Sequence, residues 1–304
     1  MTQAHKKYLV SIVGPTAVGK TSMAIQLAKH YKTVVLSADS RQFFKEISIG
    51  TAKPSEQELN DVTHYFIGHK SVADNYSAGD FERDALDLLA QLFKEHDVVI
   101  LVGGSGLYIK ALWEGLDEMP EVDMVLRNEL IASYEKEGIT YLQAQLLQLD
   151  GEKYKQIDTQ NPQRIMRAIE IAKQMTPELI AKNANNKAGR SFEVIKIALN
   201  MDRELLYQQI NKRVDIMMEQ GLLAECKSMV DYQNNYALKT VGYTEIFEFF
   251  EGRHSLEKAI ELIKQHTRNY AKRQITWFKR EQDIVWFHPT DFVPVCDFIN
   301  QKIA

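Results

Sequence analysis

The chain has 304 residues, of which 45% are hydrophobic and 26% charged, as in ordinary globular proteins, and its formal net charge is −4. This acidic balance gives no sign of general nucleic-acid affinity, so a nucleic-acid partner would have to meet a local basic patch. Cys226 and Cys296 are far apart and lack the spacing of a disulfide framework or a zinc site. The sequence leaves no room for a signal peptide before its first apolar run, and no run approaches the ~20 residues of a membrane span. We therefore expect a cytoplasmic, monomeric protein that does not contact membranes.

The first predicted elements enclose a phosphate-binding loop. Residues 8–13 are apolar and β-branched, which predicts a buried strand, and residues 21–30 carry apolar side chains at helical spacing. Between them, residues 14–21 read GPTAVGKT and fit the pattern G-x-x-x-x-G-K-[ST]. A glycine turn that opens a helix directs backbone N–H groups and the positive end of the helix dipole at one point. We predict that Lys20 reaches the outer phosphates, that the Thr21 hydroxyl binds Mg²⁺, and that the phosphate-binding set is Gly14, Pro15, Thr16, Ala17, Val18, Gly19, Lys20 and Thr21.

The acidic residue expected of an ATP-hydrolysing protein is missing from its usual strand, and an acid follows another predicted strand instead. Such proteins end an apolar strand in an acidic residue that holds Mg²⁺, but the strand predicted at 97–102 runs into Gly103 instead. An acid, Asp39, follows the apolar run 33–38. Because the carboxyl ends of neighbouring parallel strands share one crevice, Asp39 is expected to face the phosphate-binding loop as a base or a magnesium-steering group. A cap on a helix or turn is the alternative role.

Strand and helix patterns alternate over residues 8–113, which predicts an α/β fold: a P-loop NTPase-like core with a parallel sheet and helices on both faces. Residues 115–186 show only helical patterns and predict an all-helical insertion domain, whose end is marked by a polar connector at 182–189. Strand character returns at 193–199 and 284–287. We therefore expect a core domain of residues 1–114 and 187–304.

Residues 264–280 concentrate positive charge, with six Lys or Arg, no acid and three interleaved aromatic residues. Lys264, Arg268 and Lys272 recur every four residues and would share one helical face. This pattern fits a surface that follows a phosphate backbone, or a solvated helix face whose aromatic residues belong to the core. Arg164 with Arg167, and Arg213, would be ordinary surface cations unless an anion lies beside them.

A series of motifs runs along the chain in a fixed order. They are GPTAVGKT, ADSRQ (38–42), IGTAKP (49–54), GGSGLY (103–108), NPQRIMRAIE (161–170), VGYTE (241–245) and YAKRQITWF (270–278). Taken together, these segments resemble the bacterial tRNA dimethylallyltransferases, also called tRNA isopentenyltransferases, over nearly the whole chain. Two places depart from that family's pattern: Phe43-Phe44 replaces an aliphatic residue and a tyrosine, and Ser105 replaces a threonine. The zinc finger of eukaryotic relatives has no counterpart among the two cysteines.

The resemblance implies alkyl transfer rather than ATP hydrolysis. In this family the loop holds the diphosphate of dimethylallyl diphosphate, and N6 of the adenosine immediately 3′ of the anticodon attacks the allylic carbon, in tRNAs that read codons beginning with U. Lys20, Thr21 with Mg²⁺, and Arg213 would stabilise the departing diphosphate. Asp39 would be the base that takes the proton from N6.

The resemblance also implies a set of RNA contacts. The adenine must leave its stack to react, and the segment Asp39–Gln42 would line the place where it enters. The insertion domain and the basic stretch would hold the anticodon stem-loop. The RNA-binding residues implied in this way are Asp39, Ser40, Arg41, Gln42, Ser105, Arg127, Gln163, Arg164, Ile165, Met166, Arg167, Lys272 and Arg273.

Three other classes share part of this pattern. A nucleotide kinase would have the same loop and fold class but no need for the basic stretch. A prenyltransferase acting on free nucleotides would share the chemistry but have less use for the insertion. A GTPase-like RNA-binding module would require a guanine-reading N-K-x-D segment, which the sequence lacks.

Overall fold

The computed structural model describes residues 6–185 and 189–304, which divide into two compact units. Unit 1 comprises Met1–Gly115 and Arg190–Ala304, and unit 2 comprises Leu116–Gly189. In the described residues, no helix is long and apolar enough to cross a membrane.

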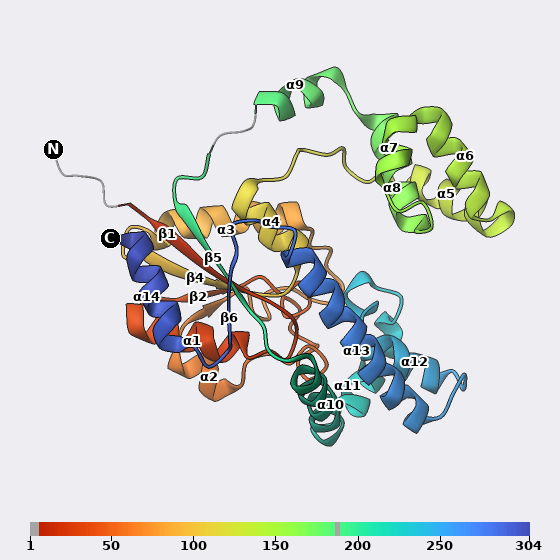
Figure 1. The fold of residues 1–304 in the computed structure, drawn as a ribbon. Coiled ribbons are helices and arrows are strands. Elements are labelled where there is room, and N and C mark those ends of the chain that lie inside the picture. The colour runs from red at the N-terminus through yellow and green to blue at the C-terminus, as the bar shows by residue number, and fades with distance from the viewer. Residues whose placement is uncertain (1–5, 186–188) are drawn as a thin grey trace. The chain divides into compact units, whose positions relative to one another are not determined.

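Unit 1 is built on a parallel sheet, and the class predicted from the sequence is confirmed as α/β (Figure 1). The strands that the structure describes form one six-stranded sheet in the order β3-β2-β4-β1-β5-β6. In the central strands Val10 pairs in register with Ile100 on one side and with Ile195 on the other. Strand β3, with only two residues, was too short to be predicted from the sequence. The strands are β1 Tyr8–Val13, β2 Val35–Ser37, β3 His64–Tyr65, β4 Val98–Val102, β5 Glu193–Leu199 and β6 Val285–Phe287.

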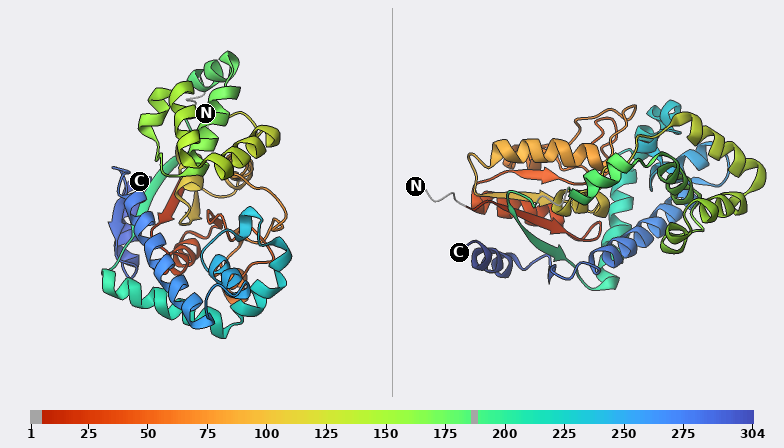
Figure 2. Two further views of the ribbon diagram at one scale, coloured as in Figure 1. Left: turned by 90° about the vertical axis from the view of Figure 1, so that its right-hand side faces the viewer. Right: turned by 90° about the horizontal axis from the view of Figure 1, so that it is seen from above.

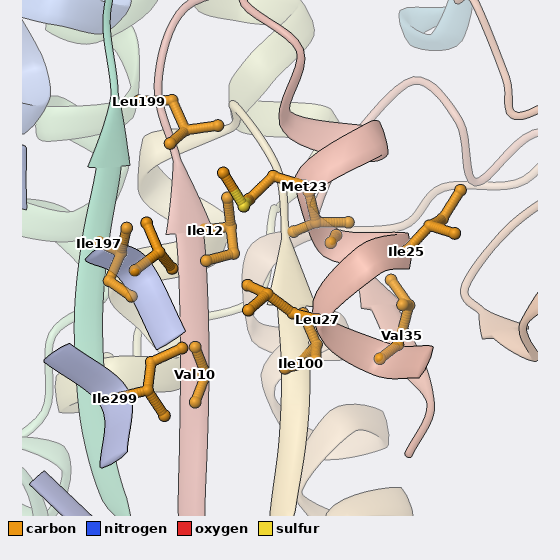
Figure 3. Close-up of a cluster of buried hydrophobic side chains, with 14 of the residues drawn as sticks. Val10, Ile12, Met23, Ile25, Leu27, Val35, Ile100, Ile197, Leu199 and Ile299 are labelled. Atoms are coloured by element: carbon orange, nitrogen blue, oxygen red, sulfur yellow. The ribbon is translucent and has the colours of Figure 1, made fainter. Parts of the chain in front are cut away.

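Helices cover both faces of this sheet (Figures 1 and 2). Against one face pack α1 and α14, whose Met23, Leu27 and Ile299 meet the strand residues Val10 and Ile100 in a buried core (Figure 3). On the other face α3 packs on α4, and α3 begins with a capping box at Ser77, as its sequence indicates. Helices α10, α11, α12 and α13 lie towards the carboxyl ends of the strands (Figure 1). The bounds in unit 1 are α1 Lys20–Tyr31, α2 Glu56–Asp61, α3 Ala78–Leu92, α4 Gly106–Glu114, α10 Arg203–Glu219, α11 Leu222–Ser228, α12 Tyr243–Phe250, α13 Leu256–Phe278 and α14 Phe292–Ile303, with 3₁₀ turns η1 Val230–Tyr232 and η2 Tyr236–Leu238.

A second core in unit 1 anchors the loop that follows β2. Phe44 and Ile47 of this loop are buried against Val214 of α10, Tyr243 of α12 and Ile263 of α13. Phe44 is 1% exposed, so its ring is part of this apolar core. This packing holds the segment after Asp39 against the C-terminal helices.

The described residues of unit 2 form only helices, as the sequence predicts. A small core joins Leu130 of α5, Leu142 and Leu146 of α6 and the buried face of α8. The predicted polar connector at 182–189 is wrong in its first part, because α9 continues through residue 185, and residues 186–188 lie outside the described residues. The helices are α5 Met124–Glu137, α6 Ile139–Leu149, α7 Gly151–Gln156, α8 Pro162–Gln174 and α9 Pro177–Asn185.

Candidate active site

The turn from β1 into α1 has the geometry of an anion-binding loop. Gly14 and Gly19 have φ values of +139° and +100°, and Ala17 has φ +64°, conformations that glycine adopts most readily. A Cβ on Gly14 would lie 2.5 Å from the carbonyl oxygen of Leu199, so β5 also requires a glycine there. No described side chain caps the start of α1, and its first turn holds no acid. The N–H groups of this turn are therefore available for phosphate oxygens.

Two cations and one carboxylate meet at this loop. The Lys20 ammonium donates to the carbonyl of Pro15 at 2.7 Å, and Arg213 of α10 donates to the Thr16 hydroxyl at 3.1 Å. Burial lowers the pKa of Lys20 to about 7, against the attraction of Asp39 and with the repulsion of Arg213. Burial also lowers the pKa of Arg213, and Asp39 acts against it. The predicted residues Lys20, Arg213 and Asp39 thus share one electrostatic environment, which favours an anionic ligand.

Gln274 of α13 ties the phosphate-binding loop to the loop that follows β4. Its side-chain oxygen accepts the Thr16 N–H at 2.8 Å, and its side-chain nitrogen donates to the Gly104 carbonyl at 3.0 Å. A Cβ on Gly104 would lie 2.2 Å from this nitrogen, so the bridge requires glycine. The side chain is 5% exposed. The sequence gives no sign of this role, although Gln274 belongs to the motif at 270–278.

Asp39 lies directly beyond β2, in a polar cluster with Ser40 and Ser105. The Asp39 carboxylate accepts the Arg41 N–H at 3.0 Å, which fixes its orientation. The Ser105 hydroxyl accepts the Ser40 N–H at 2.9 Å and donates to the Ser40 hydroxyl at 3.1 Å. Ser105 thus holds the segment after Asp39 by its hydroxyl.

Tyr270 of α13 belongs to the same cluster and was missing from the predicted set. Burial and the charge of Asp39 raise the pKa of its phenol to about 12, while Arg41, Ser105 and Arg273 act in the opposite direction. Tyr270 is therefore a neutral hydroxyl that can donate or accept a hydrogen bond beside Asp39 at neutral pH.

Arg41 and Gln42, two further residues of the predicted RNA-binding set, hold loops through hydrogen bonds within the protein. The Arg41 guanidinium donates to the Tyr236 carbonyl at 2.9 Å, and its centre lies 4.4 Å from the centre of the Tyr236 ring. The Gln42 amide donates to the carbonyls of Thr51 and Ala52 at 3.2 and 3.1 Å. Gln42 therefore joins the Asp39 segment to the loop at 49–54, and an RNA contact of its side chain would compete with these bonds.

The loop at 49–54 is held mainly by Glu225 of α11. The Glu225 carboxylate accepts the N–H groups of Ser48, Ile49 and Gly50 at 2.8, 2.8 and 2.9 Å. It also accepts the hydroxyl of buried Tyr243 at 2.5 Å. Because Glu225 lies outside every recognised motif, the sequence carried no signal for this role.

In unit 2, two predicted RNA-binding arginines are paired with a buried acid. Arg127 of α5 makes a two-pronged contact with Glu170 of α8, whose side chain is 0% exposed. Arg167 donates to the same carboxylate at 3.2 Å and to the Pro120 carbonyl at 2.8 Å. Although burial acts to raise it, the hydrogen bonds and charges of the two arginines hold the pKa of Glu170 below its usual range. In this arrangement Arg127 links α5 to α8, and Arg167 links α8 to the segment before α5.

The other predicted residues of α8 divide by exposure. Ile165 and Met166 are 0% and 1% exposed, so their side chains belong to the core of unit 2. The prediction that these side chains contact RNA is wrong, because the helical period that exposes Arg164 turns them inward. Gln163 and Arg164 are exposed.

The cations of the basic stretch on α13 also differ in exposure and in partners. Lys264 pairs with Asp215 at 2.5 Å and Arg268 donates to Asn211 at 2.6 Å, so both hold α13 against α10. The three cations at i, i+4, i+8 therefore do not form one free stripe. Lys272 and Arg273 are exposed, on different faces of the helix.

The parallel sheet, its phosphate-binding loop and the clustered charges define an α/β protein of the P-loop type whose loop suits a phosphorylated substrate. Residues 42–281 match the IPP transferase family. The chain belongs to this family.

Relatives and solved structures agree over nearly the full length. A tRNA dimethylallyltransferase of Christiangramia forsetii is 48% identical over 97% of this chain and 98% of its own, and one of Cytophaga hutchinsonii is 46% identical over 98% of both. The crystal structure of a tRNA isopentenylpyrophosphate transferase from Bacillus halodurans has a TM-score of 0.73, with 34% identity over 98% of this chain and 97% of that chain. A eukaryotic dimethylallyltransferase acting on tRNA has a TM-score of 0.77, with 25% identity over 97% of this chain and 77% of that chain.

Proposed function

We propose that this protein transfers the dimethylallyl group of dimethylallyl diphosphate to N6 of the adenosine next to the anticodon on its 3′ side, in tRNAs that read codons beginning with U. The joint electrostatic environment of Lys20, Arg213 and Asp39 at the phosphate-binding loop carries this proposal. The names of the relatives, which cover nearly the whole chain, support the reaction class.

The reaction needs no nucleoside triphosphate. N6 of adenine forms a bond to the allylic carbon as the bond between that carbon and the diphosphate oxygen breaks. The electron pair leaves with the diphosphate, and one proton moves from N6 to the Asp39 carboxylate. This explains why the strand β4 can run into Gly103 without a terminal acid, since no water has to be directed at a γ-phosphate.

The charges at the loop act mainly on the leaving group. Negative charge grows on the diphosphate during the transfer, and the Lys20 ammonium, the Arg213 guanidinium and the free N–H groups of α1 lie around the loop that would hold it. Groups fixed in this way stabilise the transition state more than the bound substrate, and losing one donor of this kind costs about 2.7–4 kcal/mol of barrier.

The donor set at the loop fits Mg²⁺ held together with the diphosphate. In the part of the chain that the structure describes, no group of three or more His, Cys, Asp or Glu could hold a metal by itself. Mg²⁺ commonly takes one or two protein oxygens and completes its shell with substrate phosphates and water. The Thr21 hydroxyl in the first turn of α1, with Asp39 nearby, would be such a protein ligand, and the ion would neutralise charge on the diphosphate.

For the RNA, the cluster of Asp39, Ser40, Ser105 and Tyr270 would form the polar surface that an unstacked adenine meets. Arg41 and the exposed Lys272 and Arg273 of unit 1 would contact phosphates, and Gln163 and Arg164 of unit 2 offer further exposed donors. Unit 2 would hold the anticodon stem-loop. We place the reaction in the cytoplasm and expect the enzyme to act as a monomer.

One labelling experiment tests the reaction. The protein is incubated with labelled dimethylallyl diphosphate, Mg²⁺ and either tRNA, AMP or ATP, and the labelled product is identified. We expect label in tRNA only, at the adenosine 3′ of the anticodon. Label in AMP or ATP, or hydrolysis of ATP, would refute the proposal.

Asp39→Asn is the matched variant for the base. It keeps the size of the side chain and an oxygen for the Arg41 N–H, but cannot take the proton. We expect transfer to fall at least 100-fold with pyrophosphate binding retained. Transfer at the normal rate would show that another group takes the proton.

A further inference from the structure

A groove on unit 1 lies between the start of α10 and the C-terminal half of α13, with a volume of about 360 Å³. Its floor is apolar, from Met201, Leu206 and Ile275. The phenol ring of Tyr207 forms part of its wall. A groove with this lining offers an aromatic or apolar group a place out of water.

Positive charge surrounds this floor. Arg203, Lys272 and Lys279 all line the groove, and in the described residues none of its lining side chains is acidic. Burial acts to raise the pKa of Tyr207, but the hydrogen bond and charge of Arg203 and the charge of Lys272 lower it, as a positive local potential requires. The acids nearest in sequence are Asp202, which caps α10 by accepting two backbone N–H groups, and Glu204, which is exposed.

A polar group without a partner completes the groove. The side-chain oxygen of Asn200, directly after β5, is buried, and it has no hydrogen-bond partner within the described parts of the chain. A buried acceptor of this kind costs free energy unless a donor reaches it. The groove therefore presents cations for an anion and an apolar floor, and its wall holds a buried acceptor that lacks a donor.

This groove is on a different face of α13 from Gln274, which bonds Thr16 and Gly104. Ala271, Ile275 and Lys279 of the groove recur every four residues, and Gln274 lies about 60° to 140° around the helix from them. A ligand in the groove would thus contact another side of the helix that holds the phosphate-binding loop.

We propose that this groove binds one nucleotide unit, with its phosphate among Arg203, Lys272 and Lys279, a ribose hydroxyl on Asn200 and its base on the apolar floor beside Tyr207. The unit is either a free nucleotide or a nucleotide of an RNA chain outside the reacting loop. The site is additional to the one that accepts the reacting adenosine, and it does not depend on the proposed transfer reaction.

Methyl NMR of the full chain tests the proposal site by site. The Met201 and Ile275 methyl groups report on the groove, and Val18 reports on the phosphate-binding loop. Titration with AMP is expected to shift the Met201 and Ile275 signals to saturation, whereas inorganic phosphate and adenosine alone bind at least tenfold more weakly. Shifts confined to Val18, or equal saturation by inorganic phosphate, would overturn the proposal.

Charge variants with matched controls separate the groove from general attraction. Arg203→Glu should weaken AMP binding at the groove reporters at least tenfold, whereas Lys227→Glu, the same charge change on exposed Lys227 of α11, should leave it within twofold. Lys279→Gln against its neighbour Arg280→Gln gives a second pair. Equal effects within both pairs would refute the site.

The source of the nucleotide follows from a third titration, with the trinucleotide UpUpU. Tighter binding of this RNA than of AMP at the groove reporters identifies a segment of RNA as the occupant. Tighter binding of AMP identifies a free nucleotide.

Discussion

At the scale of single residues, Lys20 depends on its ligand for its charge. Its ammonium is buried beside Arg213, and its pKa is about 7. A diphosphate at the loop would add negative charge next to it and raise this pKa towards the ordinary value of 10.5. Binding above pH 7 must then take up a proton, because Lys20 is largely neutral there in the free protein and charged when the diphosphate is bound.

We therefore predict that the advantage of the wild-type protein over Lys20→Met in binding pyrophosphate shrinks as the pH rises from 7 to 9. Isothermal titration calorimetry at pH 8 in two buffers of different ionisation enthalpy measures the protons taken up. Roughly nine-tenths of a group with this pKa is neutral at pH 8. The wild type should thus take up close to one more proton than Lys20→Met, which controls for the titration of pyrophosphate itself. Equal proton uptake by the two proteins would show that Lys20 is already charged in the free site.

At the scale of elements, the loop at 49–54 depends on one carboxylate from a helix far away in sequence. Glu225 of α11 accepts the N–H groups of Ser48, Ile49 and Gly50, and Gln42 joins that loop to the Asp39 segment. A Cβ on Gly50 would lie 2.6 Å from the Tyr243 ring, so the loop is pressed directly onto α12. The packing of α11 and α12 therefore bears on the position of Asp39.

Glu225→Gln is expected to lower the free energy of unfolding by about 1–3 kcal/mol, because the new amide turns an NH₂ group towards backbone donors and leaves some of them unpaired. Urea denaturation measures this loss. Glu219→Gln on the exposed face of α10 is the matched control and should change stability by no more than about 0.5 kcal/mol. The prediction fails if the two variants unfold at the same urea concentration.

The elements differ in how far the sequence could predict them. The strand–loop–helix around Lys20 was predictable because a local pattern of apolar residues and glycines specifies it. The sequence placed Asp39 near the loop through the rule for parallel strands, but it could not supply Gln274, Tyr270 or Glu225. Those residues act through contacts across 18 to 258 positions of the chain, between residues such as Thr16 and Gln274, and no local period encodes such contacts. The motif at 161–170 predicts RNA contacts at Ile165 and Met166, but successive residues of a helix turn by about 100°, so residues next to the exposed Arg164 face the core.

At the scale of the whole molecule, the two units have separate cores. In unit 2, one buried acid, Glu170, pairs with two arginines. Glu170 is 0% exposed and accepts Arg127 and Arg167, whose side chains are 20% and 30% exposed. Its pKa is lowered in the folded state. Such a group stabilises the fold above its unfolded pKa, near 4.5, and loses that contribution as the pH falls through the folded value.

Glu170→Gln should therefore destabilise unit 2 by about 2–3 kcal/mol at pH 7, below the full 3–5 kcal/mol for breaking a buried pair because water reaches both arginines. Calorimetry should show that unit 2 of the variant unfolds at a lower temperature than in the wild type. Pyrophosphate binding at the loop of unit 1 should stay within twofold of the wild type. As the pH falls below 4.5, the gap between variant and wild type should close, since protonation removes the same charge. Glu129→Gln, exposed on α5, controls for the loss of one negative charge. A single transition that shifts equally in both variants would mean that the Glu170 pairs add nothing beyond net charge, and weakened pyrophosphate binding would mean that the two units are energetically coupled.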